Sequence, residues 1–87
     1  MIESDLEEIF DELKSLIIQK NRDYGDSFHL TYEEFGLQSV YIRLTDKINR
    51  LGSLISKEAE VKDETIKDTL SDVINYSILT LLELEKE

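Results

Sequence analysis

The sequence predicts an all-α domain, a small bundle of three main helices formed by residues 1–87 as one unit. Three observations support this prediction. Apolar residues recur three and four positions apart over long stretches, which is the period of an amphipathic helix. The chain contains no proline, and its only glycines stand at positions 25, 36 and 52. No segment alternates apolar and polar residues for long enough to predict a strand.

The first helix is expected over Asp5 to Lys20. Ser4 and Glu7 have the spacing of a capping box, in which two side chains satisfy backbone N–H groups at the start of a helix. Its apolar residues share one face: Leu6, Ile9, Phe10, Leu13, Leu16 and Ile17. Lys20 continues that face, so we expect its side chain to point inward.

Three more helical stretches follow. The segment TYEEFG, residues 31–36, predicts a single short helical turn closed by its glycine. A second long helix is expected over Ser39 to Ser56, with these residues inward: Val40, Leu44, Ile48, Leu51 and Ile55. Asp63 can cap a third helix that continues to about Leu84. The segment KNRDYGDSF, residues 20–28, is predicted to be a loop, and it carries more charged and aromatic residues than a linker needs.

Composition excludes several classes of function. The chain has no cysteine and a single histidine, His29, so a bound metal would be Mg²⁺ or Mn²⁺ on oxygen ligands. A formal net charge of −10 argues against binding to a nucleic-acid polymer, because no basic surface is available for the phosphate backbone. No apolar run is long enough for a membrane span, and acidic residues follow Met1 where a signal region would be basic and apolar. We therefore expect a cytoplasmic protein without a membrane partner.

Polar residues form one stripe on the third long helix, within an arc of about 80°. The stripe contains Glu64, Asp68, Asp72 and Asn75. Like charges on adjacent helical turns repel each other unless a cation lies between them. The spacing alone leaves two interpretations open, a divalent-cation site and a solvated acidic face.

Two further patterns are present on the long helices. Charged residues recur three and four positions apart on the second one, as surface ion pairs or as part of a site: Arg43, Asp46, Lys47 and Arg50. The end of the third one is apolar nearly all round: Ile74, Ile78, Leu79, Leu81 and Leu82. Two partner helices in a chain of 87 residues cannot cover that much apolar surface. We therefore predict a homodimer or a higher even oligomer with the third helix at the interface.

Three blocks in this order resemble the nucleotide-modification-associated domain family, which is common in phages and prophages: KNRDYGDSF, FGLQSVYIRLTDKINRL and VKDETIKDTLSDVINYSIL. The blocks cover about two-thirds of the chain. That family is in turn similar to the MazG-like all-α nucleoside triphosphate pyrophosphohydrolases. In those enzymes, acidic residues on two adjacent helices hold Mg²⁺ against a triphosphate. The resemblance implies a MazG-like bundle and a bacterial or phage protein whose ligand is a nucleotide.

The resemblance also implies roles for the acidic residues. Asp46 and Asp72 would be catalytic, and Mg²⁺ would be held by Asp46, Asp68 and Asp72, with Glu64 as a fourth ligand. The bound Mg²⁺ would polarise the bridge between the α and β phosphates and activate water. MazG-like enzymes carry a Glu-x-x-Glu pair on the earlier helix, whereas Arg43 and Asp46 occupy that spacing here. A cation in place of one carboxylate leaves fewer metal ligands and is compatible with anion binding.

On this hypothesis the segment KNRDYGDSF closes one end of a cleft between the second and third long helices. The expected nucleotide contacts are Lys20, Asp23, Tyr24, Lys47, Arg50 and Asn75. Lys20 and Arg50 would neutralise phosphate, and Asp23 would hold a ribose hydroxyl or a metal-bound water. Tyr24 or Phe28 would stack on the base, and Gly25 would let the backbone approach the ligand closely.

Three functions stay open at this point. The first is a Mg²⁺-dependent pyrophosphohydrolase that acts on a nucleoside triphosphate, including a modified one. The second is a phage protein that binds, and so sequesters or senses, a nucleotide without turning it over. The third is an acidic protein that binds a host protein through its negative surface. Mg²⁺-dependent release of pyrophosphate would identify the first, binding without a product the second, and the third requires neither metal nor nucleotide.

Overall fold

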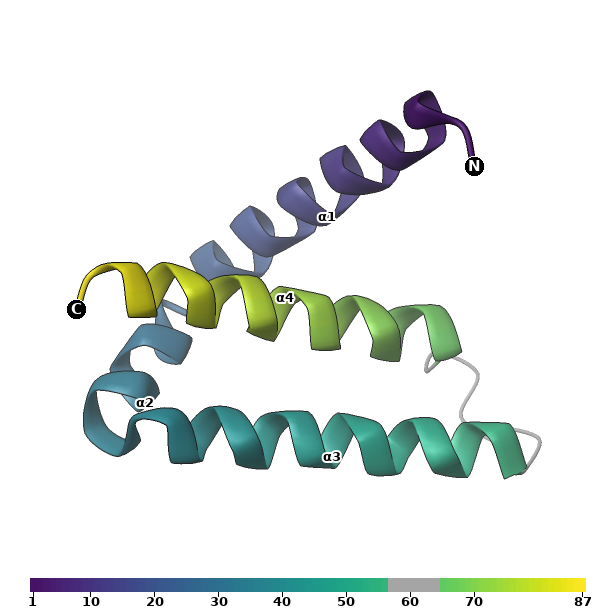
Figure 1. Cartoon of the computed structure of the whole chain (residues 1–87). Coiled ribbons are helices and arrows are strands. Elements are labelled where there is room, and N and C mark those ends of the chain that lie inside the picture. Colours follow the sequence, from purple (N-terminus) through teal and green to yellow (C-terminus); the bar gives the residue numbers. More distant parts are fainter. Residues whose placement is uncertain (57–64) are drawn as a thin grey trace.

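The computed structural model describes residues 1–56 and 65–87, and these residues form four helices and no strand, which confirms the all-α prediction. The helices are α1 (Glu3–Asp23), α2 (Ser27–Phe35), α3 (Leu37–Ser56) and α4 (Ile66–Glu85). Figure 1 shows α3 and α4 side by side and antiparallel, with α2 at one end of the pair. Helix α1 meets α4 near that same end, and its N-terminal half points away from the other helices (Figure 1).

Helix α1 begins earlier than expected and without the predicted capping box. Its N-cap is Ile2, which has no side-chain capping bond, and the backbone N–H groups of Asp5 and Leu6 donate to the Ile2 carbonyl oxygen. Ser4 therefore lies inside the first turn, where its hydroxyl cannot act as the N-cap acceptor. The capping-box prediction was wrong, because the helix extends two residues further toward the N-terminus.

The segment KNRDYGDSF is mostly helical, so the prediction of a loop was also wrong. Its first four residues are the last turn of α1, its last two residues begin α2, and only residues 24–26 lie between the helices. Gly25 and Asp26 both adopt left-handed backbone angles, with φ of 62° and 61°. Glycine adopts this conformation without steric cost, and aspartate tolerates it better than most residues. Two consecutive left-handed residues turn the chain sharply from α1 into α2.

Helix α2 has nine residues, where the sequence predicted a single turn, and it ends at Gly36 with a φ of 64°. The hydroxyl of Ser39 donates to the carbonyl oxygen of Gly36 at 2.7 Å at the start of α3. In α4, the hydroxyl oxygen of Thr65 accepts a hydrogen bond from the N–H of Asp68 at 3.0 Å and caps the helix. The predicted cap Asp63 and the predicted site residue Glu64 lie outside the described residues.

The core is small and lies between α2, α3 and α4. Its buried residues are Phe28, Tyr32 and Val40, and three partly buried residues pack against them: Leu44, Tyr76 and Leu79. Leu13 is the buried apolar residue of α1. Ile48 and Ile55 were expected to point inward from α3, but both are exposed. The buried face of α3 is therefore narrower than predicted.

The C-terminal end of α4 is tied to α2 by polar contacts. The two ring nitrogens of His29 face different carboxylates, with Nδ1 at 2.7 Å from Glu83 and Nε2 at 3.1 Å from Glu33. The hydroxyl of Tyr32 donates to Glu87 at 2.9 Å. The hydrogen bond to Glu83 and the charges of the surrounding carboxylates raise the pKa of His29 despite some desolvation.

Large apolar side chains remain on the surface of α4. Leu81 is 61% exposed and Leu82 is 50% exposed, and Ile74 and Leu84 are also exposed. None of the described helices combines the length and the apolar character that a bilayer span requires. One side of α4 therefore packs against the other helices of this fold, and its other side carries the exposed apolar residues.

Candidate functional site

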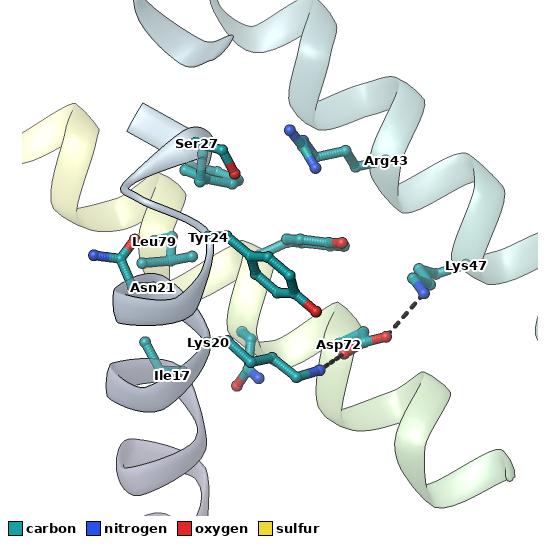
Figure 2. A pocket seen from close by; sticks show the side chains of 12 residues that line it. Ile17, Lys20, Asn21, Tyr24, Ser27, Arg43, Lys47, Asp72 and Leu79 are labelled. Carbon is teal, nitrogen blue, oxygen red and sulfur yellow. Dashed lines mark hydrogen bonds and ion pairs between the residues drawn. The ribbon is translucent and has the colours of Figure 1, made fainter. Parts of the chain in front are cut away.

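A cavity of about 370 Å³ lies where the end of α1, the start of α2 and the facing sides of α3 and α4 meet. Figure 2 shows its lining side chains. They are Ile17, Lys20, Asn21, Tyr24, Ser27, Phe28, Arg43, Lys47, Asp72, Asn75, Tyr76 and Leu79. Three of them are cations and one is a carboxylate, in a chain whose net charge is −10. The protein therefore concentrates positive charge where the four described helices meet.

Asp72 joins three helices at the wall of this cavity. One carboxylate oxygen is 2.9 Å from Nζ of Lys20 on α1, and the other is 2.8 Å from Nζ of Lys47 on α3. Figure 2 shows the two lysines reaching the carboxylate from opposite sides. Lys47 and Asp72 each keep only 16% of their side-chain surface exposed, so solvent screens this pair less than a surface pair.

The ionisation of this cluster is stabilised by its own contacts. Burial acts to raise the pKa of Asp72, but hydrogen bonds and charges from Lys47 and Lys20 outweigh it and leave the pKa below its ordinary value. The hydrogen bond to Asp72 raises the pKa of Lys47 more than burial lowers it. The sequence predicted repulsion between Asp68 and Asp72 unless a cation intervened, and two ammonium groups supply that positive charge at Asp72.

Arg43 lies against a pair of aromatic rings. Its guanidinium carbon lies 5.6 Å from the ring centroid of Phe28 and 5.5 Å from that of Tyr76. These two rings stack on each other, with centroids 6.0 Å apart and planes 15° apart. Within residues 1–56 and 65–87, Arg43 forms no ion pair with a carboxylate. The rings fix a charged group that has N–H donors to offer to an incoming anion.

Asn75 lines the cavity from α4 and is only 5% exposed. Neither its amide nitrogen nor its amide oxygen has a hydrogen-bond partner among the residues that the structure describes. Leaving a buried polar group without a partner costs about 1–3 kcal/mol, so such groups call for an explanation in a native protein. A ligand that offers both a donor and an acceptor would satisfy this side chain.

The structure brings together five of the residues predicted to form the site. Lys20, Tyr24, Lys47, Asp72 and Asn75 all line the cavity. Tyr24 caps the end of α1, keeps 67% of its surface exposed and points across the opening toward α3 (Figure 2).

Two of the predicted nucleotide contacts are not among the lining residues. Asp23, the last residue of α1, is exposed outside the cavity. Arg50 follows Lys47 by one turn of α3, and its charge acts to lower the pKa of Lys47. Gly25 does not line the cavity either, and its left-handed φ accounts for a glycine at this position.

The predicted Mg²⁺ ligands are not gathered in the described part of one chain. Asp46 lines a separate shallow hollow on the other side of α3, next to Tyr41 and Asn49. Asp68 is exposed beside the α4 N-cap, and both oxygens of Asp72 face lysines. Among residues 1–56 and 65–87, no group of three ligating side chains is close enough to hold a metal ion. The described residues of a single chain therefore do not fit a Mg²⁺ site of the predicted composition.

Sequence reasoning missed Arg43 as a site residue, together with the role of Tyr76. Arg43 and Lys47 are four positions apart on α3, and this spacing was visible in the sequence. The spacing equally fits an ordinary surface pair. What distinguishes Arg43 is its contact with two rings, which come from α2 and α4.

A comparison with protein families gives one match. The family model described as nucleotide modification associated domain 1 matches residues 20–84. This range includes every residue that lines the cavity except Ile17. No curated protein and no solved structure matches the chain.

Proposed function

Because the chain belongs to the nucleotide modification associated domain 1 family, we propose that it binds a nucleotide in the cavity between α1, α3 and α4. The observation that carries this proposal is the composition of the cavity wall. Lys20, Arg43 and Lys47 converge there beside aromatic rings, although the whole chain is strongly acidic. A nucleotide has the matching parts, an anionic phosphate and a flat base.

Each part of the nucleotide has a position in this proposal. The phosphate lies against Arg43 and Lys47, which can donate charge-assisted hydrogen bonds to its oxygens. The base stacks on the exposed ring of Tyr24 at the opening. The amide of Asn75 hydrogen-bonds to the edge of the same base. Binding would thus satisfy an amide that has no partner among the described residues.

Mg²⁺-dependent hydrolysis of a nucleoside triphosphate is a second candidate. It is favoured by Asp72 in the wall of the proposed binding site and by Asp68 one turn earlier on α4. Asp46 faces another surface of the same chain, so the pair by itself supplies few ligands. Release of pyrophosphate that depends on Mg²⁺ and is lost in Asp68→Asn would support this candidate.

We also propose that the protein assembles into a homodimer or a higher even oligomer, and that it acts in the cytoplasm of a bacterium or of a phage-infected cell. The exposed leucines of α4 support the assembly, because their burial against a second copy would remove apolar surface from water. Binding of a host protein to the acidic surface remains an alternative, and it would not depend on the cavity.

Two tyrosines of nearly equal exposure provide the test. Tyr24 at the cavity is 67% exposed and Tyr41 on the other side of α3 is 68% exposed. We expect Tyr24→Ala to weaken nucleotide binding by about 1–3 kcal/mol, the usual contribution of a stacked base, with little change in melting temperature. Tyr41→Ala should leave the affinity unchanged. Isothermal titration calorimetry on the full chain measures both, and equal affinities for the two variants would contradict the proposed site.

A further inference from the structure

The charges of the cavity wall specify how much phosphate charge it can neutralise. Lys20, Arg43 and Lys47 contribute three positive charges, and Asp72 contributes one negative charge. The wall therefore carries a net charge of +2, from three cations and one anion. A phosphomonoester carries a charge of about −1.5 to −2 at pH 7, because its second pKa is near 6. The two charges match without any added ion.

The position of the cations favours one phosphate group over several. Arg43 and Lys47 lie one turn apart and project from the same side of α3 (Figure 2). Lys20 and Lys47 already share the carboxylate of Asp72, so their charges are partly used within the protein. Among the described residues, Arg43 is the cation of the cavity wall that lies against rings and not against a carboxylate. One phosphate between Arg43 and Lys47 would meet both.

A polyphosphate chain would meet a different environment. Each further phosphate adds negative charge, which proteins that bind triphosphates commonly neutralise with Mg²⁺ between the phosphate oxygens. Such an ion takes one or two carboxylates in addition to the phosphates, and both oxygens of Asp72, the carboxylate of the cavity wall, already face lysines. The surplus charge of a triphosphate would also be placed in a protein whose own net charge is −10.

The size and polarity of the cavity agree with a small ligand. Its volume of about 370 Å³ is near the lower end of the range of about 300–1,000 Å³ for small-molecule sites. The buried amide of Asn75 requires a ligand group with both a donor and an acceptor. The edge of a nucleobase has such groups, whereas inorganic phosphate cannot stack on Tyr24 or extend from the cations to the opening.

From these observations we infer that the ligand is a nucleoside monophosphate, which the protein binds as a dianion and without a metal ion. This inference rests on the proposed nucleotide site and narrows its ligand to one phosphate. Arg43 is the residue that selects the phosphate, because its planar guanidinium can form two parallel hydrogen bonds to phosphate oxygens and its rings hold it in place. The ammonium of a lysine cannot reproduce that geometry.

The test is calorimetric titration of the full chain with the deoxynucleosides and their 5′-mono- and triphosphates, each in EDTA and in Mg²⁺. We expect a monophosphate to bind in EDTA with the same affinity as in Mg²⁺, and more tightly than its nucleoside. We expect affinity to fall when the pH is lowered from about 7.5 to about 5.5, because the phosphate becomes a monoanion. Arg43→Lys should weaken binding about tenfold or more. Arg22→Lys, an exposed exchange outside the cavity, serves as its control.

The outcomes separate this inference from the proposed function. Binding of triphosphates in Mg²⁺ alone, with no binding of monophosphates, would overturn the inference and leave the nucleotide site intact. Unchanged affinity in Arg43→Lys would overturn the placement of the phosphate. No binding of any of these compounds in either buffer would overturn both the inference and the nucleotide-binding proposal.

Discussion

Among individual residues, Asn75 has an environment that is unfavourable for a polar side chain. It is buried on α4, and neither polar atom of its side chain has a partner among the described residues. Neighbouring Thr80 is also buried on α4, but its hydroxyl donates to the carbonyl oxygen of Tyr76 at 2.7 Å. The two side chains are therefore similarly buried and differ in whether their polar atoms are satisfied. In the proposed function, the ligand would satisfy the amide of Asn75.

We predict that Asn75→Ala increases the free energy of unfolding of the ligand-free protein by about 1 kcal/mol and weakens nucleotide binding. The substitution removes two unsatisfied polar atoms and introduces the residue with the highest helix propensity. Urea denaturation measures the stability and calorimetry the affinity. Thr80→Ala is the control: it introduces the same helix former at another buried position of α4 that does not line the cavity, so it should leave the affinity unchanged. A less stable Asn75→Ala would mean that the amide packs as a structural residue.

The site could be predicted where a single helix determines the direction of a side chain. Lys20 lies on the extension of the apolar face of α1, and Asp72 and Asn75 share one stripe of α4, so helical periodicity placed all three. Asp46 was assigned through the resemblance to a catalytic family, and Arg43 was noted for its spacing without being assigned to the site. Neither source of information includes the rings of Phe28 and Tyr76, which reach Arg43 from other elements.

At the scale of the helices, α2 depends on its contacts with the C-terminal end of α4. A helix of nine residues is too short to be stable alone in water. It is held by its buried residues Phe28 and Tyr32 and by the imidazole of His29 between Glu33 and Glu83. The ammonium of Lys86 lies 3.7 Å from the same oxygen of Glu83 that faces His29. The contribution of His29 thus depends on its protonation.

We predict that the melting temperature falls as pH rises through the raised pKa of His29. A raised pKa in the folded state means that the stabilisation is complete below the ordinary pKa of histidine, about 6.5, and is lost above the folded value. The difference in melting temperature between the wild type and His29→Gln should therefore shrink from about pH 6 to about pH 8.5. Asp72 and Lys47 do not titrate in this range, because the pKa of the first is lowered and that of the second raised. A difference independent of pH would exclude this role.

The type and order of the long helices could be predicted, whereas their ends were predicted less well. The apolar period extends through residues that do not contribute to a buried face, so it could not show that α1 continues to Asp23 or that α3 begins at Leu37. The polar residues after Lys20 suggested a loop. In the structure they continue the helix until Gly25 and Asp26 turn the chain.

At the scale of the whole molecule, the chain buries few of its apolar residues. Leu13, Phe28, Tyr32 and Val40 are the buried apolar residues of the described part, while Phe10, Ile42 and Leu81 are among many that remain exposed. Small domains bury a lower fraction of their surface than large ones and are often stabilised by association. The N-terminal half of α1 and the outer face of α4 are the surfaces that association would cover.

We predict that light scattering at micromolar concentration gives the mass of a dimer or a higher even oligomer. Leu82→Lys on α4 should shift the protein toward monomer, because a charge would have to be buried at the interface. Glu85→Lys introduces the same residue at an exposed position three residues later and should leave the mass unchanged. A monomeric mass for the wild type would refute the prediction, and the exposed leucines would then be part of an ordinary surface.

The tyrosines of the cavity also have an optical consequence. The chain has four tyrosines and no tryptophan, so tyrosine fluorescence is not masked by a stronger emitter. Tyr24 and Tyr76 line the cavity, while Tyr41 lies on the other side of α3. A base stacked on the ring of Tyr24 would quench its emission and leave that of Tyr41 as a constant background. The unmodified protein therefore carries its own fluorescent reporter of ligand binding, at the ring that is proposed to touch the ligand.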